Sequence, residues 1–144
     1  MDTVLPRIRR PGVAGYCYPE DSGTLHSALQ SHLIQGCQKG PSRGLVLPHG
    51  SLEQSGAVTG ATLSRVEIPS RCIVIGPQYA QQGPSWSVLA RGVYETPLGS
   101  VPVDEALVDA LRERCSWIEA DPSAQAGEHA IDVLLPFLQI IGPS

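Results

Sequence analysis

The chain has 144 residues, with 14 acidic against 10 basic side chains and a formal net charge of −4. That length predicts one domain, and one Lys with nine scattered Arg excludes a strongly basic nucleic-acid binder. A membrane span needs roughly 18 or more consecutive apolar residues, and the longest apolar stretch, Ile131–Ile141, is shorter and interrupted. We therefore expect a protein without a membrane span that does not bind nucleic acid.

Cysteine usage bears on the cellular compartment. Cys17, Cys37, Cys72 and Cys115 include no C-x-x-C pair, the spacing typical of structural zinc and thioredoxin-type sites. Four cysteines in 144 residues are also too few for a disulfide-built scaffold, so we predict reduced and mostly buried thiols. No apolar signal segment follows the arginines near the N-terminus. These features together predict a cytoplasmic location.

The first predicted element is a helix. Asp21 or Ser22 can cap its N-terminus, its apolar pattern runs to Leu33, and Gly36 stops it. A loop rich in Gly, Pro and Ser then leads into Leu45–Pro48. That run is short, apolar and bounded by turn residues, which predicts a buried strand.

The middle of the chain alternates between helical and extended patterns. Ser55–Val66 has helical spacing of apolar residues, and Arg71–Gly76 contains the clearest strand of the sequence. A further strand is predicted at Ser87–Ala90, followed by a turn at Thr96–Gly99 and a helix capped by Asp104.

Strands that alternate with helices predict an α/β layer fold with a mainly parallel sheet and flanking helices. We expect Leu45–Pro48 and Arg71–Gly76 to be adjacent, buried and parallel. The helix Ser55–Val66 would connect them by a right-handed crossover, as nearly all such connections do.

The last predicted helix, Glu128–Ile141, is apolar almost all round. After its first three residues only Asp132 and Gln139 are polar, and a helix of this kind is normally buried on several sides. Pro136 removes a backbone donor and should kink or split it. An uncovered apolar face predicts a protein partner or a homo-oligomer. The alternative is that Pro136 folds the segment back onto the first helix and satisfies it internally.

The candidate functional residues gather at the ends of the predicted strands. His49 follows the first strand and Tyr79 the second, where open α/β sheets collect ligands. Glu128 and His129 begin the last helix and can point toward the same crevice. Two such histidines are a weak signal for a metal or acid–base site. His26 and His32 lie six residues apart on the first helix and are interpreted as surface residues.

Other chemistries lack their motifs. The serines near His49 do not stand in the strand–turn–helix setting of the nucleophile elbow of α/β hydrolases. The glycine-rich loops that bind nucleotides are also absent from the sequence. The sequence motifs therefore identify no catalytic residues, and these stay unknown.

Several stretches, in chain order, are similar to the motifs of one family. Residues 10–19 resemble R-x-P-x-V-A-G-x-F-Y-P, Leu47-Pro48-His49 with Ser55-Gly56 resembles P-H-A-G-Y-x-Y-S-G, and Ile73–Pro77 resembles V-I-L-G-P-x-H. Residues 94–104 resemble W-x-T-P-L-G-x-x-x-x-D, and residues 128–137 resemble E-H-S-x-E-x-Q-L-P-F. Together they resemble the Memo family, also described as the B component of the AmmeMemoRadiSam set.

The resemblance implies a fold like that of the class III extradiol non-haem-iron dioxygenases, with a histidine-based metal site at one end of the sheet. Carried over, His49 would be the first metal ligand and His129 a further site histidine. Two family ligands have no counterpart, because Tyr79 stands where the family has the histidine of G-P-x-H and the last ligand lies beyond this sequence. Phenol is also a poorer ligand than imidazole for borderline metals.

Two functions follow from this resemblance. The first is a single shortened Memo-like domain, residues 1–144, that no longer catalyses, binds no cofactor and serves as a structural or interaction subunit, a pseudoenzyme. The alternative is an iron- or copper-dependent redox protein of the same family, with His49, His129 and Tyr79 as ligands and a partner supplying the rest. The sequence leaves open whether the chain is a natural short protein, a splice form or a fragment.

Overall fold

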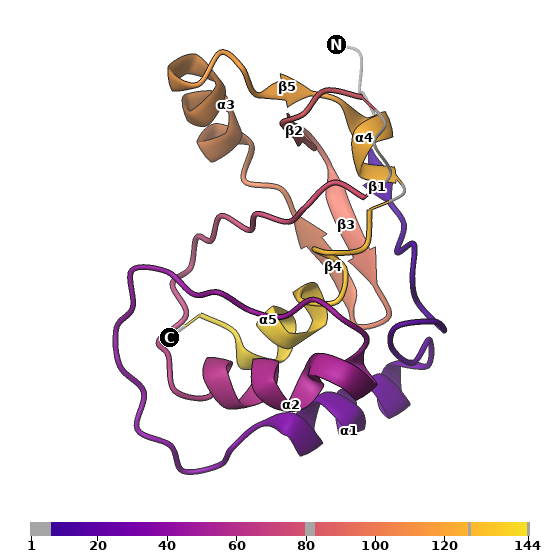
Figure 1. Cartoon of the computed structure of the whole chain (residues 1–144), viewed down its shortest axis with the longest axis vertical. Helices are drawn as coiled ribbons and strands as arrows, with labels where there is room; N and C mark the ends of the chain where they lie inside the picture. Colours follow the sequence, from indigo (N-terminus) through magenta and orange to yellow (C-terminus); the bar gives the residue numbers. More distant parts are fainter. Residues whose placement is uncertain (1–6, 80–82, 127, 144) are drawn as a thin grey trace.

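The structure is a computed structural model that describes residues 7–79, 83–126 and 128–143. It is mixed α/β, with small sheets and short helices (Figure 1). The helices within these residues are α1 (Ser22–His32), α2 (Leu52–Leu63), α3 (Glu105–Arg114), α4 (Pro122–Ala126) and α5 (Leu135–Ile141). The strands are β1 (Ile8–Arg9), β2 (Ser87–Val88), β3 (Val93–Thr96), β4 (Gly99–Pro102) and β5 (Glu119–Ala120).

Side-chain caps fix where the three longest helices begin. Asp21 accepts a hydrogen bond from the Thr24 amide at 2.8 Å at the start of α1, and Asp104 accepts one from Leu107 at 3.0 Å at the start of α3. Such caps satisfy amides that have no partner within the helix. Both predicted caps are confirmed. Helix α2 begins three residues before the predicted Ser55 because Ser51 caps it instead.

Helices α1, α2 and α5 form one packed layer, drawn together in the lower part of Figure 1. Its core contains Leu25 and Leu29 from α1, Leu63 from α2 and Phe137 from α5. The two long helices approach closely because α2 carries Gly60 at the crossing. A Cβ at Gly60 would overlap the backbone carbonyl of His32, so no larger residue fits without movement.

The terminal segment is covered from within the chain. Helix α5 begins at Leu135 with Pro136 in its first turn, where a missing N–H costs nothing. The prediction that Pro136 splits the segment is therefore confirmed, and irregular backbone followed by turns replaces the predicted helix from Glu128 to Leu134. Phe137 packs into the core against α1. Leu134, Leu138, Ile140 and Ile141 are half-buried against the same core, so the segment folds back onto the first helix as the alternative had it.

The sheets are small and of mixed direction. One has the order β1-β3-β4, with β1 parallel to β3 and β3 antiparallel to β4, and the other pairs β2 with β5 in parallel. The predicted Thr96–Gly99 turn is confirmed as the turn of the β3–β4 hairpin. Just before β3, Gly92 has a φ of +113° and lies against the backbone of Arg7. Both the conformation and the close approach require glycine there.

The prediction of buried parallel strands at Leu45–Pro48 and Arg71–Gly76 is wrong for the described residues. Neither run joins a sheet, and most of their side chains are exposed, including Val46, Ile73 and Ile75. A strand exists only where its backbone groups pair with a neighbour, and neither run has such a neighbour among the described residues. Helix α2 does connect them, but the mainly parallel sheet is absent from this part of the chain.

Candidate functional site

Three of the predicted site residues meet although their strands do not form. His49 lies three residues before the start of α2, Tyr79 lies in the extended run after α2, and His129 lies in the loop between α4 and α5. The Nε2 atom of His49 is 2.7 Å from the hydroxyl oxygen of Tyr79, a hydrogen-bonding distance. Loops distant in sequence thus supply one compact cluster.

The rings of the cluster are in mutual contact. The ring centroids of Tyr79 and His129 are 5.0 Å apart with an interplanar angle of 17°, which is a stacked arrangement. The centroid of His49 lies 5.8 Å from that of Tyr79 and 6.4 Å from that of His129. Tyr79 therefore contacts both histidines, through its hydroxyl on one side and its ring face on the other.

Glu128 does not belong to this cluster. Its side chain is buried and lines a separate cavity, and its backbone carbonyl accepts a hydrogen bond from Arg9. His26 is exposed on α1, as predicted, whereas His32 is half-buried with its ring centroid 6.5 Å from that of Phe137. Of the four predicted crevice residues the structure brings together three.

The donor set of the cluster is short of what a metal centre needs. Catalytic zinc sites commonly keep three protein ligands and structural sites four, and here His49 and His129 are the only imidazoles. No group of three or more His, Cys, Asp or Glu side chains is placed to hold a metal ion within residues 7–79, 83–126 and 128–143. The cluster residues therefore do not fit the metal that the family resemblance implies.

The cysteines add no ligands to the cluster. All four are free thiols, as predicted, and lie apart from one another in the sequence. None is fully buried, which corrects the expectation of mostly buried thiols: Cys17, Cys37 and Cys115 are half-buried and Cys72 is exposed.

A buried charged pair that sequence analysis missed stands beside the cluster's loop. The Arg9 guanidinium donates to a carboxylate oxygen of Asp132 and to the backbone carbonyls of Glu128 and Gln125. Asp132 also accepts from the Gly12 amide at 2.9 Å. These bonds fix the loop that carries His129. The signal in the sequence was Asp132 itself, since a charge within an apolar run needs a buried partner.

Tyr94 completes the surroundings of this pair. The Arg9 guanidinium carbon lies 5.4 Å from the centroid of the Tyr94 ring, a distance typical of a cation–π contact. The Tyr94 hydroxyl donates to the side chain of Gln125 at 3.2 Å. Burial raises the pKa of the Tyr94 phenol, while the nearby Arg9 charge acts in the opposite direction.

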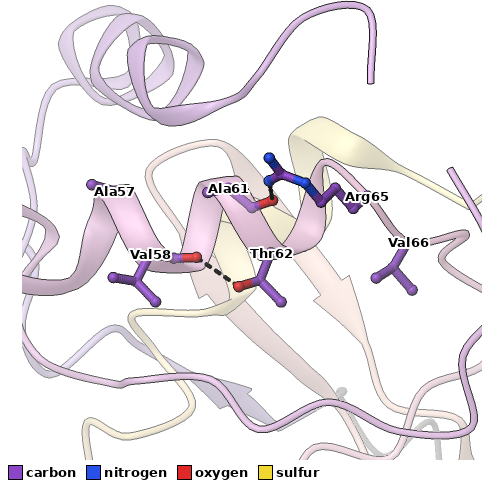
Figure 2. A pocket seen from close by; sticks show the side chains of 6 residues that line it. All are labelled: Ala57, Val58, Ala61, Thr62, Arg65 and Val66. Atoms are coloured by element: carbon purple, nitrogen blue, oxygen red, sulfur yellow. Dashed lines mark hydrogen bonds between the residues drawn. The ribbon is translucent and has the colours of Figure 1, made fainter. Parts of the chain in front are cut away.

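Hollows elsewhere in the described part of the chain are lined by residues other than those of the cluster. The larger, about 620 Å³, lies between the segment 72–78 and the hairpin β3–β4 with α3, and is mainly apolar. The smaller, about 500 Å³, is an open hollow over the outer face of α2. Figure 2 shows the side chains that line it, where Arg65 donates to the Ala61 carbonyl at 2.6 Å and Thr62 to the Val58 carbonyl at 2.8 Å. Its polar groups are thus bonded within their own helix.

Comparison with known proteins identifies the class to which this arrangement belongs. A sequence model of the Memo-like protein family matches residues 9–143. A MEMO1 family protein of Thermoplasma volcanium is 34% identical over 138 residues, which cover 92% of this chain and 50% of the relative. Its counterpart in Methanopyrus kandleri is 34% identical over 146 residues, covering 92% and 52%, and that of Thermotoga neapolitana is 34% identical over 149, covering 93% and 54%.

The chain belongs to the Memo family, and the predicted family is confirmed. It spans about half the length of the curated relatives it matches. No helix among the described residues combines the length and apolar character that a membrane crossing requires. The matched region includes His49, Tyr79 and His129, so the cluster lies within the part of the chain that is similar to the family.

Proposed function

We propose that this chain is a non-catalytic Memo-family domain in which Tyr79 occupies the place of a metal ligand and closes the cluster, and that it acts as a structural or interaction subunit. The observation that carries the proposal is the 2.7 Å hydrogen bond between the Tyr79 hydroxyl and Nε2 of His49. Nε2 is one of the two ring nitrogens through which histidine binds metals. In this cluster it bonds to the phenol instead.

Stacking strengthens the same argument. The Tyr79 ring lies against His129, so the phenol is held between the two remaining imidazoles. An ordinary phenol loses its proton only near pH 10, whereas an ordinary imidazole is neutral, and so able to bind a metal, above about pH 6.5. The relation in fold to extradiol dioxygenases and the cytoplasmic location stay parts of this proposal. Both rest on the sequence alone.

Metal content is the direct test. Purified protein, dialysed and analysed by mass spectrometry for iron, copper and zinc, should carry well under one equivalent of any of them. Tyr79→His should gain Co²⁺ or Zn²⁺ binding, because it supplies the third imidazole that catalytic sites commonly have. Tyr79→Phe is the matched control, since it removes the hydroxyl without adding a ligand, and it should gain none.

The redox alternative has one observation in its favour, which is that His49, Tyr79 and His129 meet at all. It requires iron or copper to be bound in stoichiometric amount by the unchanged protein. Metal that survives dialysis and is lost in His49→Ala would contradict the non-catalytic proposal and favour the alternative. Absence of metal uptake by Tyr79→His, with its fold intact by circular dichroism, would contradict the idea that Tyr79 alone blocks the site.

A further inference from the structure

One glycine lies where the segments that carry Tyr79 and His129 approach each other. Gly76 stands three residues before Tyr79, and Ala130 directly follows His129. A Cβ built on Gly76 would be 2.9 Å from the Ala130 Cβ, whereas carbon atoms in contact rest at about 3.5–4.0 Å. The backbone at residue 76 is therefore closer to Ala130 than a side chain at that position would allow.

The requirement for glycine at this position comes from space and not from backbone conformation. Gly76 does not have a positive φ, unlike Gly92, so its backbone could accommodate alanine. The next atoms that a Cβ on Gly76 would meet are the Ile131 Cγ1 at 3.5 Å and the Ala130 carbonyl carbon at 3.8 Å, both at ordinary contact distances. Among the described residues other than its chain neighbours, only the Ala130 Cβ would be too close.

The loop that carries His129 is held in place on both sides of Ala130. Ala130 itself is buried, with 2% of its surface exposed. The Arg9 guanidinium donates to the backbone carbonyl of Glu128 before it and to the carboxylate of Asp132 after it. Separating a buried ion pair is costly because it leaves a charge buried without a partner. The loop is therefore the fixed side of this contact.

The segment that carries Tyr79 is held less firmly. Residues 71–79 lie outside both sheets of the described chain, and Figure 1 shows them as an extended trace between α2 and β2. The cavity of about 620 Å³ separates much of this segment from the β3–β4 hairpin and α3. Gly76 is also exposed. A methyl group at residue 76 would therefore displace this segment, and Tyr79 with it, and leave the buried loop in place.

We propose that Gly76 and Ala130 are positioning residues of the cluster. Their close approach sets how far the Tyr79 ring lies from His129, where the two ring centroids are 5.0 Å apart. It also sets the 2.7 Å distance from the Tyr79 hydroxyl to Nε2 of His49. A hydrogen bond is lost beyond about 3.5 Å, so displacing Tyr79 by about 1 Å would break this one. The inference goes beyond the proposed function and does not depend on whether the cluster binds a metal.

Nuclear magnetic resonance of the full chain tests this positioning role. In Gly76→Ala the nuclear Overhauser contacts between the rings of Tyr79 and His129 should be lost. The ¹⁵N resonance of His49 Nε2 should move to its position in Tyr79→Phe, which lacks the hydroxyl. Spectra are recorded at about pH 8.5, where ordinary imidazoles are neutral. Gly44→Ala is the matched control, because a Cβ on Gly44 would meet no described atom within 4 Å, and it should leave both signals unchanged.

A second substitution distinguishes positioning from general destabilisation. Ala130→Gly removes the atom that the new methyl group would strike, so Gly76→Ala combined with Ala130→Gly should restore the ring contacts and the His49 signal. Urea unfolding followed by circular dichroism checks that each variant folds. Ring contacts that persist in a folded Gly76→Ala chain, or that stay absent in the double variant, would overturn the proposal. A Gly76→Ala chain that does not fold would overturn it too, because the proposal requires the segment to move while the core stays intact.

Discussion

The helical layer and the region around the larger cavity differ in how fully they bury their apolar side chains. In the layer, Leu25, Leu29, Leu63 and Phe137 are almost completely removed from water. Around the cavity of about 620 Å³, by contrast, Ile73 and Ile75 stay exposed, and Trp86 and Trp117 contact each other edge to face while both remain about half exposed. Helices can satisfy their own backbone, whereas strands depend on neighbours. The helices of the layer therefore bury their apolar side chains within this chain, whereas large apolar side chains around the cavity stay in contact with solvent.

The largest expected effect contrasts one residue from each region. Phe137→Ala should lower the free energy of unfolding by about 3–5 kcal/mol, because the side chain is 2% exposed and its loss leaves a cavity in the core. Ile75→Ala removes a side chain that is already mostly in water, and at concentrations where the chain is monomeric should change stability by about 0.5 kcal/mol or less. Urea unfolding followed by circular dichroism measures both. Equal losses would show that the two regions are equally packed.

The next effect concerns the buried pair that joins the N-terminal strand to the loop of His129. Arg9→Met should cost about 3 kcal/mol in urea unfolding, because it leaves the Asp132 carboxylate buried without its cation. Arg91→Met should cost about 0.2–1 kcal/mol, since the ion pair of Arg91 with Asp109 on α3 is exposed.

A double variant separates charge from packing in that pair. Arg9→Met combined with Asp132→Leu removes both charges and should recover most of the stability lost in the single variant. A double variant no more stable than Arg9→Met would mean that the hydrogen bonds of Arg9 to the carbonyls of Gln125 and Glu128 matter more than the charge of Asp132.

The smallest effect is the response to alkaline pH. Burial raises the pKa of Tyr94, and burial together with the negative charge of Asp132 raises that of Tyr18. Unfolded tyrosine titrates near pH 10, so the stability that the neutral phenols contribute is fully present below about pH 10 and lost as pH rises toward the folded pKa. Urea midpoints measured from pH 8 to 11 should therefore fall at the upper end.

Substitutions assign this alkaline loss to a residue. Tyr94→Phe should cost about 0.5–1.5 kcal/mol at neutral pH, through the hydrogen bond to Gln125, and should flatten the alkaline decline. Tyr16→Phe is the control, because Tyr16 is 94% exposed, and it should leave the decline unchanged. A decline that is equally steep in Tyr94→Phe would rule out this residue as its source.

Local signals in the sequence correctly determined several elements. The caps Asp21 and Asp104, the turn at Thr96–Gly99 and the split at Pro136 were all predictable because each depends on side chains within a few residues. Family membership was predictable for a related reason, since each of the short motifs that indicate it is read from neighbouring residues in the sequence.

Only the tertiary structure decided the rest. Leu45–Pro48 and Arg71–Gly76 carry strand patterns, yet whether they become strands depends on a neighbour that no local pattern encodes. The contact of Tyr79 with His49 and His129 joins loops that lie 30 and 50 residues away in the chain, so the sequence could suggest the meeting but not its hydrogen bond. Arg9 and Asp132 lie 123 positions apart and pair for the same reason. Each charge needs the other because both are buried, and only the folded chain determines which residues are buried.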